Sequence, residues 1–267
     1  MIRLAIRTPS EHAEQVLAAL LERAPAGLEQ VDRERFTEYA VYGTGSVLAD
    51  LGRGSGELAG APIVVSEQDV PGDWAEHWKR FHRPAVIGDR LYVRPPWAPA
   101  PVRGALQDLV IEPGQAFGTG SHSTTRLSLE LLLALPADGS FADLGCGSGI
   151  LAIAAAKLGF GPVVAVDSDP LAVEATVANA RRNAVALARV ELADLRTDEL
   201  SAANTVAANL TQPLLLRLAE RFAGRASALI VSGLLDQQAG EVANAFAPLR
   251  MSRRLTREGW TALLLER

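Results

Sequence analysis

The sequence contains a single cysteine among 267 residues, Cys146, so no disulfide can form within the chain. It also lacks any apolar run long enough to span a membrane, and residues 1–7 alternate as in a strand rather than as in a signal peptide. The 26 basic residues are scattered and are outnumbered by 31 acidic ones, which gives a formal net charge of -5 and no dominant phosphate-binding surface. We therefore expect a monomeric, cytoplasmic protein with no membrane contact and no direct nucleic-acid specificity.

Apolar residues make up 48% of the chain, which is enough for one large domain and a small one. Residues 1–66 predict the small domain. Strand and helix patterns follow one another there, with strands at 2–6, 28–33, 36–42 and 62–66 and helices from Ser10 and near Ser46. Strand, helix, two strands, helix, strand is the ferredoxin-like order, a common α+β frame for recognition domains. The glycine-rich residues 52–60 are interpreted as a loop.

Residues 67–100 are interpreted as a linker. Trp74, Trp78 and Phe81 are spaced by four and three, so they share one helical face. Packing of a connecting helix onto a neighbouring domain explains these rings, and an aromatic binding patch is the alternative. Two short strands at 84–87 and 90–93 follow, and proline-rich residues lead into the next domain.

Residues 101–267 alternate strands and helices. The expected strands are 108–112, 141–144, 163–167, 190–192, 205–209, 228–232, 250–256 and 260–265, and the expected helices are 123–135, 149–158, 170–183, 213–222 and 236–246. No crossover separates the last two strands, which meet at Glu258-Gly259 and must form a hairpin. The pattern predicts an α/β, Rossmann-like domain whose mostly parallel sheet ends in an antiparallel hairpin.

A turn at residues 143–149 carries the strongest functional signal, because an aspartate, Asp143, is followed by alternating glycines at 145, 147 and 149. Bare backbone lets a ligand approach closely, and Asp167, at the tip of the next strand, can accept both hydroxyls of a ribose. Dinucleotide sites need Gly-x-Gly-x-x-Gly, but Ile150 stands at the last position here. The pattern therefore favours S-adenosylmethionine over NAD and a methyltransferase over a dehydrogenase. Cys146, inside the turn, is expected to be structural.

A second motif precedes the turn, at residues 112–125. Its glycines free the backbone, while Phe117, His122 and Thr125 supply a ring and hydrogen-bonding groups, so the loop can fold over a ligand. Five segments, at 116–125, 143–149, 166–170, 208–210 and 232–237, resemble the ribosomal-protein methyltransferases of the PrmA type. That family modifies protein eleven of the large ribosomal subunit, and the resemblance spans nearly the whole chain.

The resemblance implies a class I fold with a seven-stranded sheet and an amino-terminal domain that recognises the substrate. It also implies that Thr125 bonds the cofactor, that Gly145 lines its amino-acid end, that Asp167 holds the ribose, and that Asn209 faces the methyl group. Two alternatives with purely structural roles stay open: Thr125 caps a helix, and Asn209 closes the turn after its strand. Gly147, Asp143 and Phe117 complete the expected cofactor set, and no metal is expected.

The implied reaction is N-methylation of lysine side chains and the α-amino group. A lysine with a pKa near 10.4 must lose its proton, which costs about 4 to 5 kcal/mol at pH 7. We expect Asn209 to orient the amine as the catalytic residue, with His122 either a base or a group that orders the loop. Enzymes that modify bases or glutamine typically carry Asn-Pro-Pro-Tyr at this strand, whereas Asn209 is followed by Leu-Thr-Gln-Pro, so such enzymes are disfavoured. A methyltransferase with another protein or small-molecule substrate, or a cofactor-binding ribosome-assembly factor without turnover, remains an alternative.

Overall fold

The computed structural model describes residues 2–23, 29–33, 35–43, 52–69, 82–101, 106–114, 116–199, 202–222 and 226–267. It divides into two compact units, Met1–Phe81 and His82–Arg267, so residues 82–100 of the expected linker belong to the second unit. The functional bounds 1–66, 67–100 and 101–267 stay predictions. The expected helix near Ser46 and the aromatic residues 74–81 lie outside the described residues. No helix within the described ranges is both long and apolar enough to cross a membrane.

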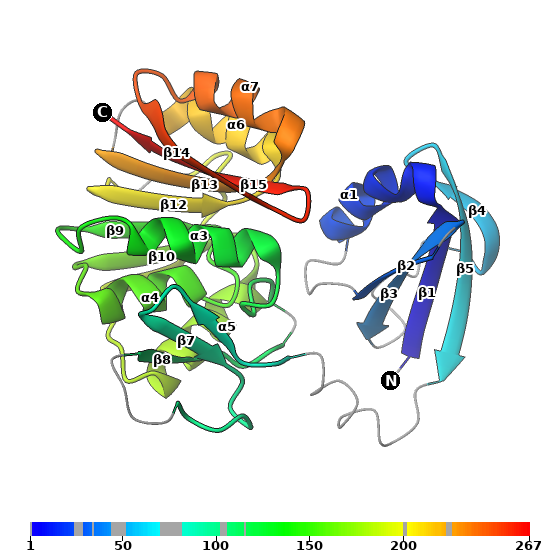
Figure 1. The fold of residues 1–267 in the computed structure, drawn as a ribbon, viewed down its shortest axis with the longest axis horizontal. Helices are drawn as coiled ribbons and strands as arrows, with labels where there is room; N and C mark the ends of the chain where they lie inside the picture. The colour runs from blue at the N-terminus through cyan, green and yellow to red at the C-terminus, as the bar shows by residue number, and fades with distance from the viewer. Residues whose placement is uncertain are drawn as a thin grey trace. The chain divides into compact units, whose positions relative to one another are not determined.

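The first unit contains a five-stranded antiparallel sheet with strand order β2-β3-β1-β5-β4 (Figure 1). Its elements are β1 (Ile2–Pro9), a 3-10 turn (Ser10–His12), α1 (Ala13–Arg23), β2 (Glu29–Asp32), β3 (Phe36–Gly43), β4 (Gly54–Leu58) and β5 (Ala61–Asp69). Alternate strand residues such as Ile6 and Ile63 pack against Val16 and Leu20 of α1 in one buried cluster. The ferredoxin-like designation stays a prediction, because its second helix falls on undescribed residues.

Strand β4 corrects one expectation, since residues 52–60 were interpreted as a loop. Gly54–Leu58 instead pairs with β5 across a two-residue turn and forms the edge of the sheet. Four of its five residues are exposed, so no apolar alternation marks the strand. Sequence periodicity cannot detect an edge strand in which only the last residue, Leu58, is buried.

The second unit is built on a seven-stranded sheet with strand order β11-β10-β9-β12-β13-β15-β14. The strands are β9 (Phe141–Leu144), β10 (Val163–Asp167), β11 (Arg189–Leu192), β12 (Thr205–Asn209), β13 (Ala228–Leu235), β14 (Arg250–Arg257) and β15 (Trp260–Glu266). Neighbours from β11 to β13 are parallel, whereas β15 runs antiparallel to both β13 and β14. This topology confirms the expected class I methyltransferase fold with its antiparallel C-terminal hairpin.

A separate three-stranded sheet adjoins the second unit's core. It contains β6 (Ala85–Ile87), β7 (Leu91–Arg94) and β8 (Gln107–Val110), with β7 and β8 parallel. The strand expected at 108–112 is β8, and it lies in the second unit as expected. The guanidinium of Arg94 holds both carboxylate oxygens of Asp108 at 2.8 Å and keeps β8 beside β7, outside the seven-stranded sheet.

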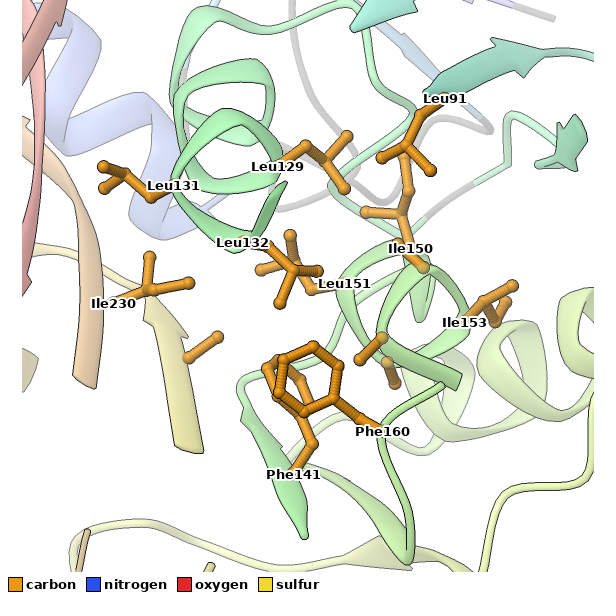
Figure 2. Packing of buried hydrophobic residues seen from close by; sticks show 14 of the residues in the cluster. Leu91, Leu129, Leu131, Leu132, Phe141, Ile150, Leu151, Ile153, Phe160 and Ile230 are labelled. Atoms are coloured by element: carbon orange, nitrogen blue, oxygen red, sulfur yellow. The ribbon is translucent and has the colours of Figure 1, made fainter. Parts of the chain in front are cut away.

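Helices cover both faces of the seven-stranded sheet, because alternate residues of each strand point to opposite sides. The helices are α3 (Ser123–Leu133), α4 (Ile150–Leu158), α5 (Pro170–Arg182), α6 (Gln212–Phe222) and α7 (Ala239–Ala245). Phe141 and Ile230 face α3, α4 and α5, whereas Leu144 and Val231 face α6 and α7. Figure 2 shows the first of these layers, where Leu132 of α3 lies among side chains of α4 and the sheet.

The order of the strands positions the candidate site. β9 lies between β10 and β12, with Leu144 opposite both Val166 and Ala208. The carboxyl ends of these three parallel strands therefore meet at one edge of the sheet. Asp167 ends β10, Asn209 ends β12, and the glycine turn leaves β9 at the same edge.

Candidate functional site

The glycine turn folds against two neighbours that leave no room for side chains. Gly145 and Gly147 have φ values of +77° and +53°, in the left-handed region that favours glycine. A Cβ at Gly145 would collide with the side chain of Leu210, and one at Gly147 would collide with the carbonyl oxygen of Phe117. Conformation therefore favours glycine at both positions, and at Gly147 space requires it as well, because the obstructing atom belongs to the backbone.

The carboxylate of Asp167 is bonded into this turn. Its Oδ2 accepts the backbone N–H of Gly147 at 2.9 Å, and its Oδ1 accepts the N–H of Asp169 at 3.0 Å. Each carboxylate oxygen can accept a further hydrogen bond. The sequence prediction that the acid and the glycine turn lie together is therefore matched by the geometry, and the partly buried carboxylate keeps free acceptor capacity.

Asp143 is buried at the start of the glycine turn. Its side chain is 1% exposed, and its Oδ2 accepts the N–H of Ala152 in the first turn of α4 at 3.0 Å. Burial raises the pKa of Asp143 to about 7, an effect that the Ala152 hydrogen bond opposes and that the charge of Asp167 adds to. In the structure this residue joins β9 to α4.

Thr125 occupies the third position of α3, and the helix is capped by His122 instead. The alternative that Thr125 is a helix cap is therefore wrong. Among the described residues, the Thr125 Oγ1 is the one buried side-chain oxygen or nitrogen without a hydrogen-bond partner. An unsatisfied buried hydroxyl costs about 1 to 3 kcal/mol. This orphaned oxygen fits a ligand that supplies the missing hydrogen bond.

The loop at residues 116–122, which we call the cofactor loop, lies directly on the glycine turn. The backbone N–H of Ser148 donates to the Phe117 carbonyl at 2.8 Å, and the Ser148 hydroxyl donates to the Gly118 carbonyl at 2.6 Å. The Phe117 ring meets His122 edge-on, with 5.3 Å between ring centroids. The two sequence motifs thus form one site.

His122 orders this loop. Its Nδ1 lies 3.3 Å from the N–H of Thr124 and 2.8 Å from the Thr124 Oγ1, so that nitrogen accepts a hydrogen bond and the ring proton is on Nε2. Burial lowers the pKa of His122, and the nearby Glu258 only partly offsets this. The use of Nδ1 as the cap of α3, together with the lowered basicity of the ring, supports the loop-ordering alternative rather than the general base.

Asn209 ends β12 with a partly exposed side chain. The backbone pairing with β13 continues one residue past it, since the N–H of Leu210 donates to the Ser232 carbonyl at 3.0 Å. Within the described part of the chain, no hydrogen bond is found for the Asn209 side chain. Its amide is therefore available to a ligand, and the alternative that it closes the turn loses its basis.

Helix α5 contributes support that the sequence analysis missed. Asn179 accepts the N–H of Glu112 and donates to the Ser148 carbonyl, and Thr176 donates to the Gly147 carbonyl. Asn183, one turn further, both accepts from and donates to the backbone of Val110. A signal was present, because these polar residues recur at helical spacing on a buried face.

Cys146 is 5% exposed and its Sγ lies 3.3 Å from the Thr176 Oγ1. Burial raises the pKa of the thiol, so it stays protonated and is not a nucleophile. No group of three or more histidine, cysteine, aspartate or glutamate side chains within the described residues is arranged to hold a metal ion.

Comparison with known proteins gives concordant matches. A family model described as ribosomal protein L11 methyltransferase (PrmA) matches residues 61–267. The ribosomal protein L11 methyltransferase of Bordetella bronchiseptica is 44% identical over 215 residues, which cover 74% of this chain and 68% of the relative. That of Pelotomaculum thermopropionicum is 41% identical over 216 residues, covering 77% and 70%. The crystal structure of ribosomal protein L11 methylase from Lactobacillus delbrueckii subsp. bulgaricus superposes with a TM-score of 0.64 and 27% identity, covering 70% of this chain and 99% of that one.

Proposed function

The chain belongs to the ribosomal protein L11 methyltransferase family, and from that premise we propose that it transfers methyl groups from S-adenosylmethionine to lysine side chains and the α-amino group of ribosomal protein L11. One observation carries the proposal. Asp167 and the glycine turn are joined by a hydrogen bond at the carboxyl edge of a class I methyltransferase sheet. The Gly-x-Gly-x-Gly spacing there suits a nucleoside cofactor without phosphates.

The residues present fit that cofactor. Asp167 would hold the ribose hydroxyls, Gly145 and Gly147 would present bare backbone to the amino-acid end, and Thr125 would satisfy its orphaned hydroxyl on the ligand. Phe117 would cover the site from the cofactor loop, and Asp143 would hold the turn in shape. When bound, the cofactor supplies an electrophilic methyl group on a sulfonium.

Asn209 is the residue that we assign to the incoming amine. Its side-chain amide oxygen can accept a hydrogen bond from the nitrogen and thereby aim the lone pair. The amine must be neutral, and removal from water lowers the pKa of a lysine because burial disfavours its charged form. No dedicated base is needed once water carries off the proton, which agrees with a partly buried His122 whose Nδ1 is occupied in capping α3.

The remaining proposals concern the substrate, the cellular location and the oligomeric state of the enzyme. We propose that ribosomal protein L11 is the substrate, that the first unit recognises it, and that the enzyme works in the cytoplasm as a monomer without direct nucleic-acid specificity. The names of the relatives support the substrate. The separation of the chain into two compact units supports a division between recognition and catalysis.

Incubation of the purified protein with S-adenosylmethionine and purified ribosomal protein L11 tests the proposal. Intact-mass and peptide mass spectrometry should show added methyl groups on lysines and on the amino terminus, and Asn209→Ala should lower the rate at saturating cofactor by at least about tenfold. Cofactor binding without any transfer to L11 would favour the assembly factor. Transfer at an unchanged rate by Asn209→Ala would remove Asn209 from catalysis.

A further inference from the structure

The hairpin formed by β14 and β15 touches the cofactor loop, although the two are far apart in the sequence. The hydroxyl of Ser123 donates to the Glu258 carboxylate at 2.5 Å, across 135 residues. The ring of Trp260 meets His122 edge-on, with 5.1 Å between centroids. The end of the hairpin therefore contacts both the last residue of the loop and the first residue of α3.

These contacts continue without a break to the glycine turn. Trp260 touches His122, His122 touches Phe117, and the Phe117 carbonyl accepts the N–H of Ser148. The same carbonyl occupies the space that a Cβ at Gly147 would need. A change in the position of the hairpin is thus transmitted through packed rings to the backbone that is expected to receive the cofactor.

The hairpin is a stiff support for this purpose. Arg257 pairs with Trp260 across a two-residue turn in which Glu258 and Gly259 both have positive φ, at +52° and +79°, as in the tightest hairpin turns. A second contact ties β14 to α3, because the Arg257 guanidinium lies 2.9 Å from the Glu130 carboxylate of α3. The loop and α3 are therefore fixed to the hairpin at His122, Ser123 and Glu130.

We propose that Glu258 and Trp260 are positioning residues for the cofactor site, a role that rests on the proposed function. They hold the cofactor loop and the first turn of α3 in the conformation in which Phe117 and Thr125 face the ligand. A loop that is ordered before binding has less conformational entropy to lose, so its ligand binds more tightly. Neither residue is required to touch the cofactor or the amine.

The experiment measures affinity for S-adenosylhomocysteine, the reaction's other product, by titration calorimetry on the full chain. Trp260→Ala and Glu258→Ala should each weaken binding by about three- to tenfold, the size expected for one aromatic pair or one charge-assisted hydrogen bond. Trp260→Phe and Glu258→Gln should restore most of the affinity, because each keeps a ring or an acceptor. At saturating cofactor, the methylation rate of each of these variants should stay within about twofold of the wild-type rate.

Arg254→Ala is the matched control, since Arg254 lies on β14 of the same hairpin but pairs with Asp236 instead of the loop. Its affinity for S-adenosylhomocysteine should equal that of wild type. Amide hydrogen exchange adds a readout that general destabilisation would not give, because residues 116–122 should exchange faster in Trp260→Ala and Glu258→Ala while β9 and α4 stay protected.

Unchanged affinity together with unchanged exchange at residues 116–122 in both alanine variants would overturn the inference. Should Trp260→Ala fail to fold, the Glu258→Ala and Glu258→Gln pair decides the matter, because Glu258 is an exposed turn residue whose loss opens no cavity. Failure of the wild-type protein itself to bind S-adenosylhomocysteine is a different result, and it would refute the proposed function.

Discussion

Thr125 presents a buried hydroxyl with no partner, a costly arrangement that a ligand can relieve. Thr125→Val keeps the shape of the side chain and removes the hydroxyl. We expect the ligand-free variant to gain about 1 kcal/mol of unfolding free energy and to bind S-adenosylhomocysteine about fivefold more weakly. Thermal unfolding and calorimetry measure the two effects.

Ser128→Ala is the control, because Ser128 lies one turn further along α3, is equally buried, and donates to the Thr124 carbonyl. It should lose stability and keep its affinity for the ligand. A Thr125→Val protein that is less stable and binds normally would show that the hydroxyl has a structural partner rather than a ligand.

The stability of the protein should depend on pH through Asp143, because burial raises the pKa of its carboxyl from 3.8 to about 7. Between these values the unfolded carboxyl is ionised and the folded one is protonated, so the folded state binds more protons. The stability that Asp143 contributes is complete below pH 3.8 and falls by up to about 1.4 kcal/mol per pH unit until the pH passes 7.

Asp143→Asn keeps an oxygen for the Ala152 N–H and cannot ionise. Its melting temperature, relative to wild type, should therefore rise from pH 5 to about pH 7 and then level off. Differential scanning calorimetry across that range measures the difference. Parallel melting curves for the two proteins would show that Asp143 titrates normally.

Local spacing predicted the glycines, Asp167 and Thr125 as parts of one candidate site. Asn179 and Asn183 were not identified as supporting residues from the sequence. Their hydrogen-bond partners are backbone groups of Glu112, Ser148 and Val110, which only the tertiary fold brings near. Their helical spacing could have marked a polar face of α5, but the sequence does not show which distant backbone groups these side chains bond.

At the scale of elements, α3 begins with a cap that can titrate. His122 accepts the Thr124 N–H through Nδ1, and burial holds its pKa below 6.5, with Glu258 opposing. A depressed pKa means that the contribution to stability is present above pH 6.5 and is lost as the pH falls through the folded value. Protonation also removes the acceptor, so the cap fails and the cofactor loop loosens.

Affinity for S-adenosylhomocysteine in the wild type should therefore fall as the pH drops through the folded-state pKa of His122, which lies below 6.5. His122→Asn provides the comparison, because asparagine is a good N-cap that does not titrate. Its affinity should change less over the same interval when measured by calorimetry at several pH values. If the affinity depends on pH equally in both proteins, a group other than His122 is responsible for the dependence.

Strongly periodic elements were predictable, and those held by pairing alone were not. The helices at 123–135 and 170–183 and the C-terminal hairpin were expected close to their observed bounds. β4 was missed because its residues are exposed, and the three-stranded sheet that contains β8 was not foreseen because a four-residue strand does not specify its neighbour. Hydrophobic patterning reports burial, whereas strand order depends on contacts distant in sequence.

At the scale of the whole molecule, all the candidate cofactor residues lie in the unit His82–Arg267. Saturation of the full chain with S-adenosylhomocysteine should therefore slow amide hydrogen exchange at the glycine turn, the cofactor loop and the end of β12. Residues 2–23 and 52–69 of the first unit should exchange as before. Equal protection of both units would show that cofactor binding is not confined to the second.

The central claim is that S-adenosylmethionine binds at the glycine turn with its ribose on Asp167, and titration calorimetry of wild type and Asp167→Asn tests it most directly. Asparagine keeps an oxygen that can accept the Gly147 N–H but loses the charge and one acceptor. The account predicts heat of binding at a single site in the wild type and at least about tenfold weaker affinity in the variant. No heat in folded wild-type protein, or equal affinity in the two, would contradict it.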